Sequence, residues 1–260
     1  MIRAASEIIR NLVEIKDSSA EFLLRLDDGR VIDTKSWNDW EWTHGIGLYG
    51  IYKYYEQARD ARCRQIMLDW FRDRFAAGPP TKNINTVAPF LTLACLHEES
   101  PNGEWLPHFD EWAECLMNGL PRTEENGFQH IVFNSENRQQ LWDDTLMMSV
   151  LPLASIGKLL GRPHYVEEAR RQFMVHVKYL VDRRTGDPAR EFHSAAHRDP
   201  STRPGSFGTA RPRADNIDSK GSPCKVRSPA TTSAALASAP ARFVCMLSAN
   251  CPATTAAPMR

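Results

Sequence analysis

The sequence predicts an all-α protein, and two observations support this class. Between Trp40 and about Arg183, apolar residues recur at three- and four-residue spacing in one segment after another. Each segment ends in a short loop rich in Gly, Pro, Asn or Asp, such as Gly78-Pro79-Pro80. The chain contains no P-loop and no dinucleotide-binding fingerprint. We therefore expect a series of about seven helices joined by short loops.

The expected helices follow one another with little chain between them. They cover residues 4–15, 40–59, 61–75, 85–97, 107–120, 138–160 and 163–183. Between the first two, Asp27-Asp28-Gly29 predicts a turn between short extended pieces. The segment 119–137 contains the β-favouring stretch 127–133 and predicts a hairpin-type loop, which is as reasonable a place for function as for a surface excursion.

The composition changes after Asp187. The stretch 187–260 is dense in Ala, Ser, Thr, Arg and Pro and contains no Trp or Tyr, whereas all seven tryptophans lie between Trp37 and Trp142. No apolar period continues into it. We expect a folded domain over residues 1–186 and a disordered or poorly packed tail over 187–260.

Charge and cysteine content exclude several classes of protein. The 32 basic residues balance the 32 acidic ones, so no overall field attracts nucleic acid or an anionic membrane. No segment has the length and apolarity of a signal peptide or a membrane span, which predicts a cytoplasmic protein. The six cysteines are scattered without a C-x-x-C pair, which favours reduced thiols over a zinc site.

The densest chemical signal is Asp143-Asp144 between Trp142 and a Leu-Met-Met run. If the pair lies on a helix, its side chains point in different directions, and Asp144 turns toward Met147 and Met148. Burial there would disfavour the charged form, which suits a general acid. The residues alone slightly favour a simpler interpretation, in which both carboxylates complement the helix dipole.

Three further candidates also have ordinary structural explanations. Asn85 begins an expected helix, where capping is the default role. Trp40 and Trp42 belong to an aromatic cluster at another helix start, where core packing competes with stacking on a sugar. His130 is a lone histidine in the expected loop. All candidates fall at helix starts or in a loop that precedes one, and such positions converge at one end of a helical array.

Four motifs in register resemble the unsaturated rhamnogalacturonyl hydrolases, glycoside hydrolase family 105, which is related to the unsaturated glucuronyl hydrolases. They are W-x-W-T-H-G-I-G-L-Y-G (40–50), N-x-N-T-V-A-P-x-L-T-L-A (83–94), G-F-Q-H-I (127–131) and L-W-D-D-T-L-M-M-S (141–149). The resemblance implies an (α/α)6 barrel, of which the expected helices make up a little over half.

The resemblance also implies a reaction. The family hydrates the double bond of a 4,5-unsaturated uronic acid at the non-reducing end of oligosaccharides made by pectin-type lyases, so that the sugar leaves in a keto form. Asp144 matches the family's general acid/base, and His130 matches a residue that binds the substrate. Trp40 and Trp42 match positions near the sugar-binding mouth, and Asn85 stands where relatives often carry an aspartate. No metal, organic cofactor, nucleic acid or membrane partner is implied.

The resemblance stops after Arg184-Thr185-Gly186, where the family's later aromatic and arginine contacts and further helices are missing. This abrupt change is typical of a frameshift, a mis-spliced exon or a mispredicted gene. A barrel without those helices would expose apolar faces and leave its pocket open on one side. The alternatives are therefore a neighbouring specificity for unsaturated glucuronyl residues, an inactive remnant, and a noncatalytic carbohydrate-binding helical module.

Overall fold

The computed structural model of the chain describes residues 2–26, 29–133, 135–181, 186 and 191–193. The predicted tail, 187–260, lies outside these residues except for 191–193. Within the described part, helices dominate and strands are few and short, which confirms the predicted all-α class. The helices are α1 (Ile2–Glu14), α2 (Trp42–Ala58), α3 (Ala61–Ala77), α4 (Pro89–Glu99), α5 (Leu106–Glu114), α6 (Leu151–Leu159) and α7 (Pro163–Leu180).

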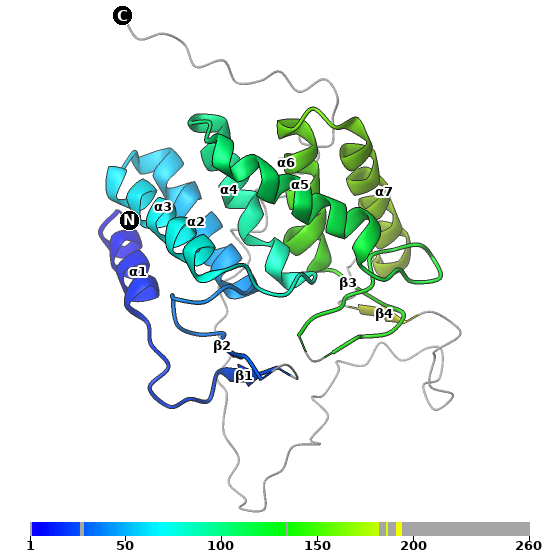
Figure 1. Ribbon diagram of the computed structural model, residues 1–260, viewed down its shortest axis with the longest axis horizontal. Helices are drawn as coiled ribbons and strands as arrows, with labels where there is room; N and C mark the ends of the chain where they lie inside the picture. Colours follow the sequence, from blue (N-terminus) through cyan, green and yellow to red (C-terminus); the bar gives the residue numbers. More distant parts are fainter. Residues whose placement is uncertain (1, 27–28, 134, 182–185, 187–190, 194–260) are drawn as a thin grey trace, which may run out of the picture.

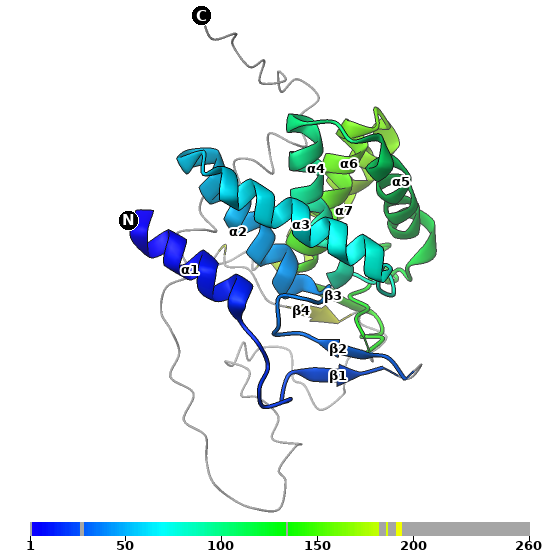
Figure 2. The ribbon, with the colours of Figure 1, turned by 60° about the vertical axis from the view of Figure 1, so that its left-hand side comes forward.

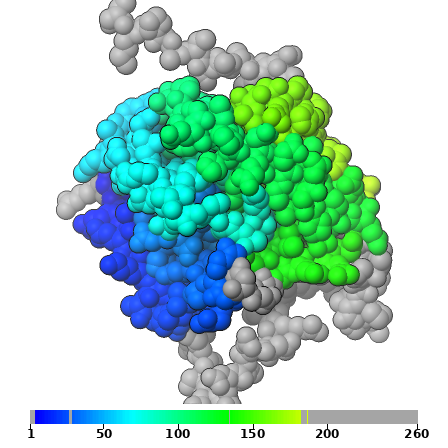
Figure 3. Space-filling model, viewed as in Figure 1, coloured from blue at the N-terminus to red at the C-terminus, as the bar shows by residue number. Residues whose placement is uncertain are grey.

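Three helical hairpins make two layers (Figures 1 and 2). In the inner layer α2 packs against α4, and α4 packs against α6. The outer layer contains α3, α5 and α7, and each of these follows its inner partner in the chain. Helix α1 packs on α2 at one edge, and α7 lies at the other. Figure 3 shows the blue amino-terminal part and the yellow-green α6 and α7 on opposite sides of the molecule.

Two of the inner helices, α4 and α6, have sequences that are apolar nearly all round. Every residue from Pro89 to His97 in α4 is buried, and so is every residue from Leu151 to Gly157 in α6. The outer helix α7 buries one stripe, Tyr165, Ala169, Gln172, His176 and Leu180, at three- and four-residue spacing. A helix without a polar face has to be covered on all sides, whereas an amphipathic helix covers it from outside.

Local signals set most helix ends where the sequence predicted them. The Asp60 carboxylate accepts the Arg62 N–H at the start of α3, and Pro163 is the first residue of α7. At the end of α2, Arg59 adopts a left-handed conformation with φ of 54°, and Gly78 ends α3 with φ of 92°. The helix expected over 107–120 is α5 continued by the π-helical turn η3 (Cys115–Gly119).

Two small antiparallel hairpins complete the described structure. Strand β1 (Leu23–Arg25) pairs with β2 (Val31–Asp33), so the predicted extended pieces are confirmed. Asp27 and Asp28 of the predicted turn lie outside the described residues. The segment 119–137 is a loop with bridges between Arg122 and Phe128 and between Val132 and Ser135, as its β-favouring sequence indicated. Strand β3 (Gln140–Trp142) pairs with β4 (Glu191–His193).

The helix expected over 138–160 is wrong in its first part. Residues 140–142 form strand β3, and helical structure begins only after Asp144, with the π-helical turn η4 (Leu146–Val150) that continues into α6. The strand forms because the Gln140 carbonyl accepts the His130 N–H, at 3.0 Å, and because β4 supplies a partner. Neither partner is close in sequence, so local periodicity did not reveal them.

The helix expected over 85–97 is also interrupted. Residues Asn85–Val87 form a 3-10 turn, η1, and α4 begins at Pro89. Proline lacks an N–H and restricts the residue before it, which favours a new helix start at this position.

Candidate active site

Asp144 lies between β3 and the helical turn η4. Its carbonyl oxygen accepts the N–H groups of Met147 and Met148, both at 2.9 Å. Asp144 therefore stands just before the first helical turn and not inside the helix. The neighbouring Asp143 is exposed, while Asp144 is intermediate. The Asp144 side chain is 41% exposed, but its Oδ1 atom is buried. The carboxyl therefore faces solvent on one side and protein on the other.

On its buried side, the Asp144 carboxyl contacts His130. The Nδ1 atom of His130 lies 3.3 Å from Asp144 Oδ1 and 2.9 Å from Thr145 Oγ1. The His130 ring is stacked on Trp142, with ring centroids 4.6 Å apart and planes 10° from parallel. His130 is only 3% exposed. The structure thus brings two of the predicted residues into contact and places the imidazole against the buried oxygen of the carboxyl.

Backbone contacts on both sides hold His130 in place. Its N–H donates to the Gln140 carbonyl, and its carbonyl accepts the Asn137 side-chain amide at 2.8 Å. Because β3 leads directly to Asp144, the loop and the catalytic candidate share one hydrogen-bonded unit.

Helix α7 fixes the beginning of the same loop. Gln172, which is fully buried, accepts the Phe128 N–H at 2.8 Å and donates to Glu168. Glu168 also pairs with Arg122 and Arg171. Burial by itself would raise the pKa of Glu168, but hydrogen bonds from its two arginine partners and Gln172 outweigh it and lower the pKa to about 2. The carboxylate is therefore ionised and anchors the loop.

Asn85 does not cap the turn that it begins. Asn83 does so, because its Oδ1 accepts the N–H groups of Asn85 at 2.9 Å and Thr86 at 3.1 Å. The default role that the sequence gave Asn85 therefore belongs to Asn83.

The backbone next to Asn85 is tied to the His130 loop and to the helix that follows Asp144. The Ile84 N–H donates to the Ile131 carbonyl at 3.1 Å, and Ser149 Oγ donates to the Ile84 carbonyl at 2.8 Å. Asn85, His130 and Asp144 therefore come from three segments joined at one end of the inner layer.

Sequence reasoning missed Glu41. This residue precedes α2, is 3% exposed, and uses its Oε2 to accept the Trp42 N–H at 2.6 Å. Burial raises the pKa of Glu41 to about 7, although the hydrogen bond from the Trp42 N–H favours its ionised form. A signal was present in the sequence, since glutamate is not among the favoured N-cap residues and this one stands between two tryptophans.

The two predicted tryptophans lie in different environments. Trp42, the first residue of α2, is 43% exposed. Trp40 is 2% exposed, is stacked on Trp112 at 5.9 Å, and donates its Nε1–H to the Thr86 carbonyl at 2.8 Å. A ring covered in this way packs the core, which is the alternative that the sequence left open. Through Thr86 it also holds the turn that carries Asn85.

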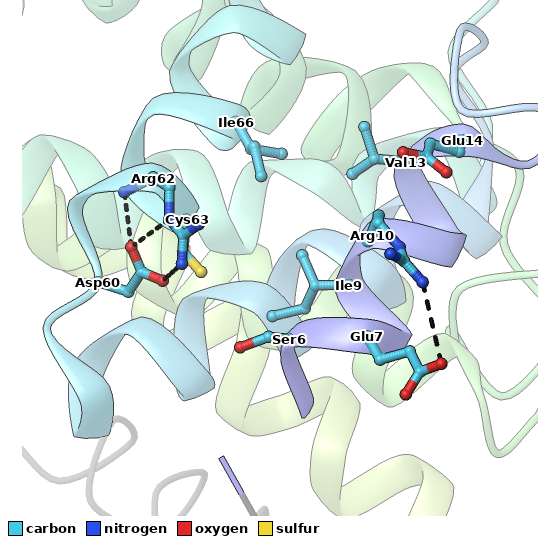
Figure 4. Close-up of a pocket in the computed structure, with 10 residues that line it drawn as sticks. All are labelled: Ser6, Glu7, Ile9, Arg10, Val13, Glu14, Asp60, Arg62, Cys63 and Ile66. Atoms are coloured by element: carbon cyan, nitrogen blue, oxygen red, sulfur yellow. Dashed lines mark hydrogen bonds and ion pairs between the residues drawn. The ribbon is translucent and has the colours of Figure 1, made fainter. Parts of the chain in front are cut away.

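Two hollows in the described structure contain none of the five predicted residues. The larger, of about 560 Å³, lies between α1 and α3, where Figure 4 shows Ile9 and Val13 near Ile66, with the ion pairs Glu7–Arg10 and Asp60–Arg62 around them. The smaller, of about 320 Å³, lies in the 121–139 loop and is lined by Gln129 and Ile131, on either side of His130.

Two further properties follow from the described residues. They contain no cluster of three or more His, Cys, Asp or Glu side chains placed to hold a metal ion. None of their helices combines the length and apolarity needed to span a membrane.

Solved structures from two bacteria resemble this chain closely. One, described as a possible GH105 member from Salmonella enterica subsp. enterica serovar Paratyphi A str. ATCC 9150, is 57% identical, with a TM-score of 0.73 over 76% of this chain and 52% of that one. A second possible GH105 member, from Klebsiella pneumoniae subsp. pneumoniae MGH 78578, is also 57% identical, with a TM-score of 0.73 over 75% of this chain and 51% of that one.

More distant relatives agree with these. A family 105 glycoside hydrolase from C. acetobutylicum ATCC 824 is 22% identical, with a TM-score of 0.51 over 61% of this chain and 45% of its own, and it supports the fold alone. The unsaturated rhamnogalacturonyl hydrolase YesR of Bacillus subtilis (strain 168) is 32% identical over 145 residues, which are 55% of this chain and 42% of YesR. The chain thus spans about half the length of these relatives or less.

The profile of Glycosyl Hydrolase Family 88 matches residues 14–206. This match crosses residue 186, and strand β4 also lies beyond that position. The domain boundary expected there stays a prediction. Because the match covers most of the chain, and the solved relatives share its helical hairpins and more than half of its residues over the aligned length, this chain belongs to Glycosyl Hydrolase Family 88.

Proposed function

We propose that the chain carries the catalytic residue of a glycoside hydrolase that releases 4,5-unsaturated uronic acid from the non-reducing end of oligosaccharides made by pectin-type lyases. The family membership and the name of the relative YesR support this substrate class. The reaction is hydration of the C4–C5 double bond. It needs one proton donor at C4 and one group that accepts a proton from the water that adds at C5.

The contact between Asp144 and His130 carries the proposal. A carboxyl with one side open to solvent can reach a substrate, while a buried imidazole 3.3 Å from Oδ1 fixes its orientation. Protonated Asp144 gives its proton to C4, and the resulting carboxylate takes a proton from the attacking water. This second transfer leaves Asp144 protonated again. The hemiketal then opens to a ketone at C5 and a hemiacetal at C1, and the hemiacetal releases the remaining sugar as an alcohol, which leaves the open-chain keto sugar.

The other predicted residues have supporting roles. Trp42, which is exposed, offers a ring for stacking on a sugar. Asn85 offers an amide for hydrogen bonds to the hydroxyl groups of the sugar. His130 orients Asp144 through its contact with the buried carboxyl oxygen. Trp40 acts indirectly, because its indole holds the turn that contains Asn85.

The test is loss of the ultraviolet absorbance of the conjugated double bond in unsaturated rhamnogalacturonan disaccharide. We expect Asp144→Asn to reduce the rate at least about a hundredfold, because an amide can neither give nor take the proton. Asp143→Asn is the matched control, since Asp143 is the exposed neighbour of the same chemistry. It should retain nearly all activity.

Two outcomes would contradict the proposal. Equal activity of wild type and Asp144→Asn would remove Asp144 from the mechanism. Binding of the disaccharide by a folded wild-type protein without loss of absorbance would favour a noncatalytic carbohydrate-binding module.

A further inference from the structure

Thr145 is a buried residue at the contact between Asp144 and His130. It follows Asp144 directly in the chain, and its exposed fraction is 0%. Its Oγ1 atom lies 2.9 Å from His130 Nδ1, whereas Asp144 Oδ1 lies 3.3 Å from the same nitrogen. The nearer partner of the imidazole is therefore the hydroxyl group and not the carboxyl. Because this hydroxyl is buried, any effect that it has on a reaction has to pass through His130.

The ring of His130 has little freedom to turn away from these two oxygens. Trp142 is stacked on it, with planes 10° from parallel. The backbone of His130 is held on both sides, because its N–H donates to the Gln140 carbonyl and its carbonyl accepts the Asn137 side-chain amide. The fold thus sets the neighbours of Nδ1, and the remaining question is whether this nitrogen carries a proton.

The two oxygens favour one position for the proton of a neutral imidazole. If Nδ1 carries it, the hydroxyl oxygen and the carboxyl oxygen can both accept, whether Asp144 is ionised or not. If Nδ1 is bare, only the Thr145 hydroxyl can donate to it, and its lone pair also faces the buried Oδ1 of Asp144. That arrangement is repulsive whenever Asp144 is ionised. The contacts therefore favour a proton on Nδ1, with Thr145 as the nearer acceptor.

A proton on His130 Nδ1 also determines which oxygen of Asp144 can carry one. An N–H group beside Oδ1 disfavours a proton on that oxygen, because two hydrogens would then face each other. Oδ1 is buried while 41% of the Asp144 side chain is exposed, so the accessible oxygen is Oδ2. The exchangeable proton is thereby kept on the oxygen that solvent or a substrate can reach.

We propose that Thr145 is a positioning residue, whose hydroxyl oxygen holds a proton on His130 Nδ1 and so keeps the exchangeable proton of Asp144 on its exposed oxygen. The transfer of that proton to a sugar rests on the proposed function. The position of the proton on His130 does not, so the two parts can fail separately.

Nitrogen-15 magnetic resonance of labelled histidines in the full chain shows which ring nitrogen carries the proton. The structure supplies one reference of each kind. His176 Nδ1 lies 2.7 Å from the Gln172 carbonyl, which can only accept, so this ring carries its proton on Nδ1. His44 Nδ1 accepts the Glu41 N–H at 3.0 Å, so its proton lies on Nε2. Burial lowers the pKa of both rings, so both are neutral at neutral pH.

We expect the His130 signals of the wild type to be of the His176 kind. In Thr145→Val, which removes the nearer acceptor, they should move toward a mixture of the two tautomers. The matched variant Thr145→Ser keeps the hydroxyl and should keep the wild-type pattern. The signals of His176 and His44 should be the same in all three proteins.

Two results would overturn the assignment of the proton. The first is a wild type in which the His130 signals are of the His44 kind or of a doubly protonated ring, and this result does not depend on whether the variants fold. The second is a folded Thr145→Val whose His130 signals equal those of the wild type.

The absorbance assay on unsaturated rhamnogalacturonan disaccharide tests the consequence for the reaction. Because Thr145 is buried and touches no sugar, we expect Thr145→Val to lower kcat about tenfold or more and to leave KM within about twofold. Thr145→Ser should retain most of the rate. A wild-type kcat in Thr145→Val would overturn the positioning role. A wild type without turnover, but with His130 signals of the His176 kind, would instead contradict the proposed function and leave the assignment of the proton intact.

Discussion

Burial distinguishes two carboxyls that each stand beside a helix start. Glu41 is 3% exposed and its pKa rises to about 7, while the Asp144 side chain is 41% exposed above a buried imidazole. The first can exchange a proton near neutrality but touches only protein. The second reaches solvent. Asp144 is therefore the carboxyl that can reach a substrate in the proposed reaction.

The raised pKa of Glu41 makes stability depend on pH. The folded protein holds a proton that the unfolded chain, with the ordinary value of 4.5, has already released. The contribution of this carboxyl is fully present below pH 4.5 and is lost as pH rises to about 7. Above that pH we expect Glu41→Gln to raise the free energy of unfolding by about 2 to 3 kcal/mol.

Urea denaturation followed by tryptophan fluorescence, at matched pH values, measures this difference. The gain should disappear as pH falls toward 4.5. The control is Glu104→Gln, which makes the same change at an exposed glutamate. Its free energy of unfolding should differ little from that of the wild type at every pH. A constant gain for Glu41→Gln at all pH values would contradict the assignment of the proton.

At the scale of elements, α2 and the start of α4 approach each other closely. Gly45 makes this approach possible, because a Cβ atom there would lie 2.4 Å from the Ala88 Cβ and 2.9 Å from the Pro89 nitrogen. Gly50, one and a half turns later in the same helix, has nothing within 4 Å of such an atom. Gly45 therefore allows the two elements to pack closely, whereas Gly50 has no part in this contact.

The two glycines therefore predict opposite effects of one substitution. Gly45→Ala should lower the free energy of unfolding by about 1 to 3 kcal/mol, because backbone must move to admit the methyl group. Gly50→Ala should raise it by about 0.5 to 1 kcal/mol through helix propensity alone. Thermal unfolding by circular dichroism distinguishes these outcomes. A stabilised Gly45→Ala would show that the two helices are less closely packed.

Helix α7 contributes to the site through Glu168. The pKa of Glu168 is lowered to about 2, so its stabilising effect is present above the ordinary value of 4.5 and is lost as pH falls toward 2. At neutral pH we expect Glu168→Gln to lower the free energy of unfolding by about 2 kcal/mol. Chemical denaturation at neutral and acidic pH would show the loss and its decrease on acidification.

The adjacent Glu167 is the matched control for this experiment. It forms an ion pair with Arg170 at the same spacing, but its side chain is 62% exposed. Glu167→Gln should change stability by less than about 0.5 kcal/mol. Equal effects of the two variants would mean that the contacts of Glu168 to the 122–128 loop add nothing.

At the scale of the whole molecule, the helical hairpins form an open row. The chain spans about half of its solved relatives' length, and α1 and α7 lie at opposite edges (Figure 1). Large apolar side chains are exposed on both, Ile8 at 67% and Met174 at 57%. Exposed apolar side chains at open edges favour association with another protein surface.

We therefore expect the chain to self-associate as its concentration rises. Sedimentation velocity should show a shift to larger species that is reduced in the double variant Ile8→Glu and Met174→Glu. Leu106→Glu is the control, because Leu106 is 40% exposed but lies at the start of the outer helix α5. A monomer at all concentrations, or an equal effect of the control, would contradict this role of the edges.

Local features of the fold were predictable, and pairings between distant segments were not. The ends of α3 and α7 followed from Asp60, Gly78 and Pro163. Strand β3 was missed because its partners, the 127–133 loop and β4, lie elsewhere in the sequence. With only 3 residues, β3 is too short for an alternating pattern to distinguish a strand from the beginning of the helix that follows.

The site shows the same division. Motifs at a predicted helix start and in the loop before it gave Asp144 and His130 as candidates, and the structure brings them into contact. Glu41 was missed because its burial arises only when the start of α2 packs against the rest of the fold. Asn83 was not recognised as the cap, since the sequence contains two asparagines only two positions apart and does not show which side chain turns toward the backbone.

The row of inner helices also determines which part of the molecule unfolds locally first. Helix α4 has α2 on one side and α6 on the other, whereas α1 packs chiefly on α2 alone. In such a linear array each unit is stabilised by its neighbours, so an end unit can detach while the middle remains intact. Backbone amide hydrogens of α4 should therefore exchange with deuterated water last, and those of α1 first.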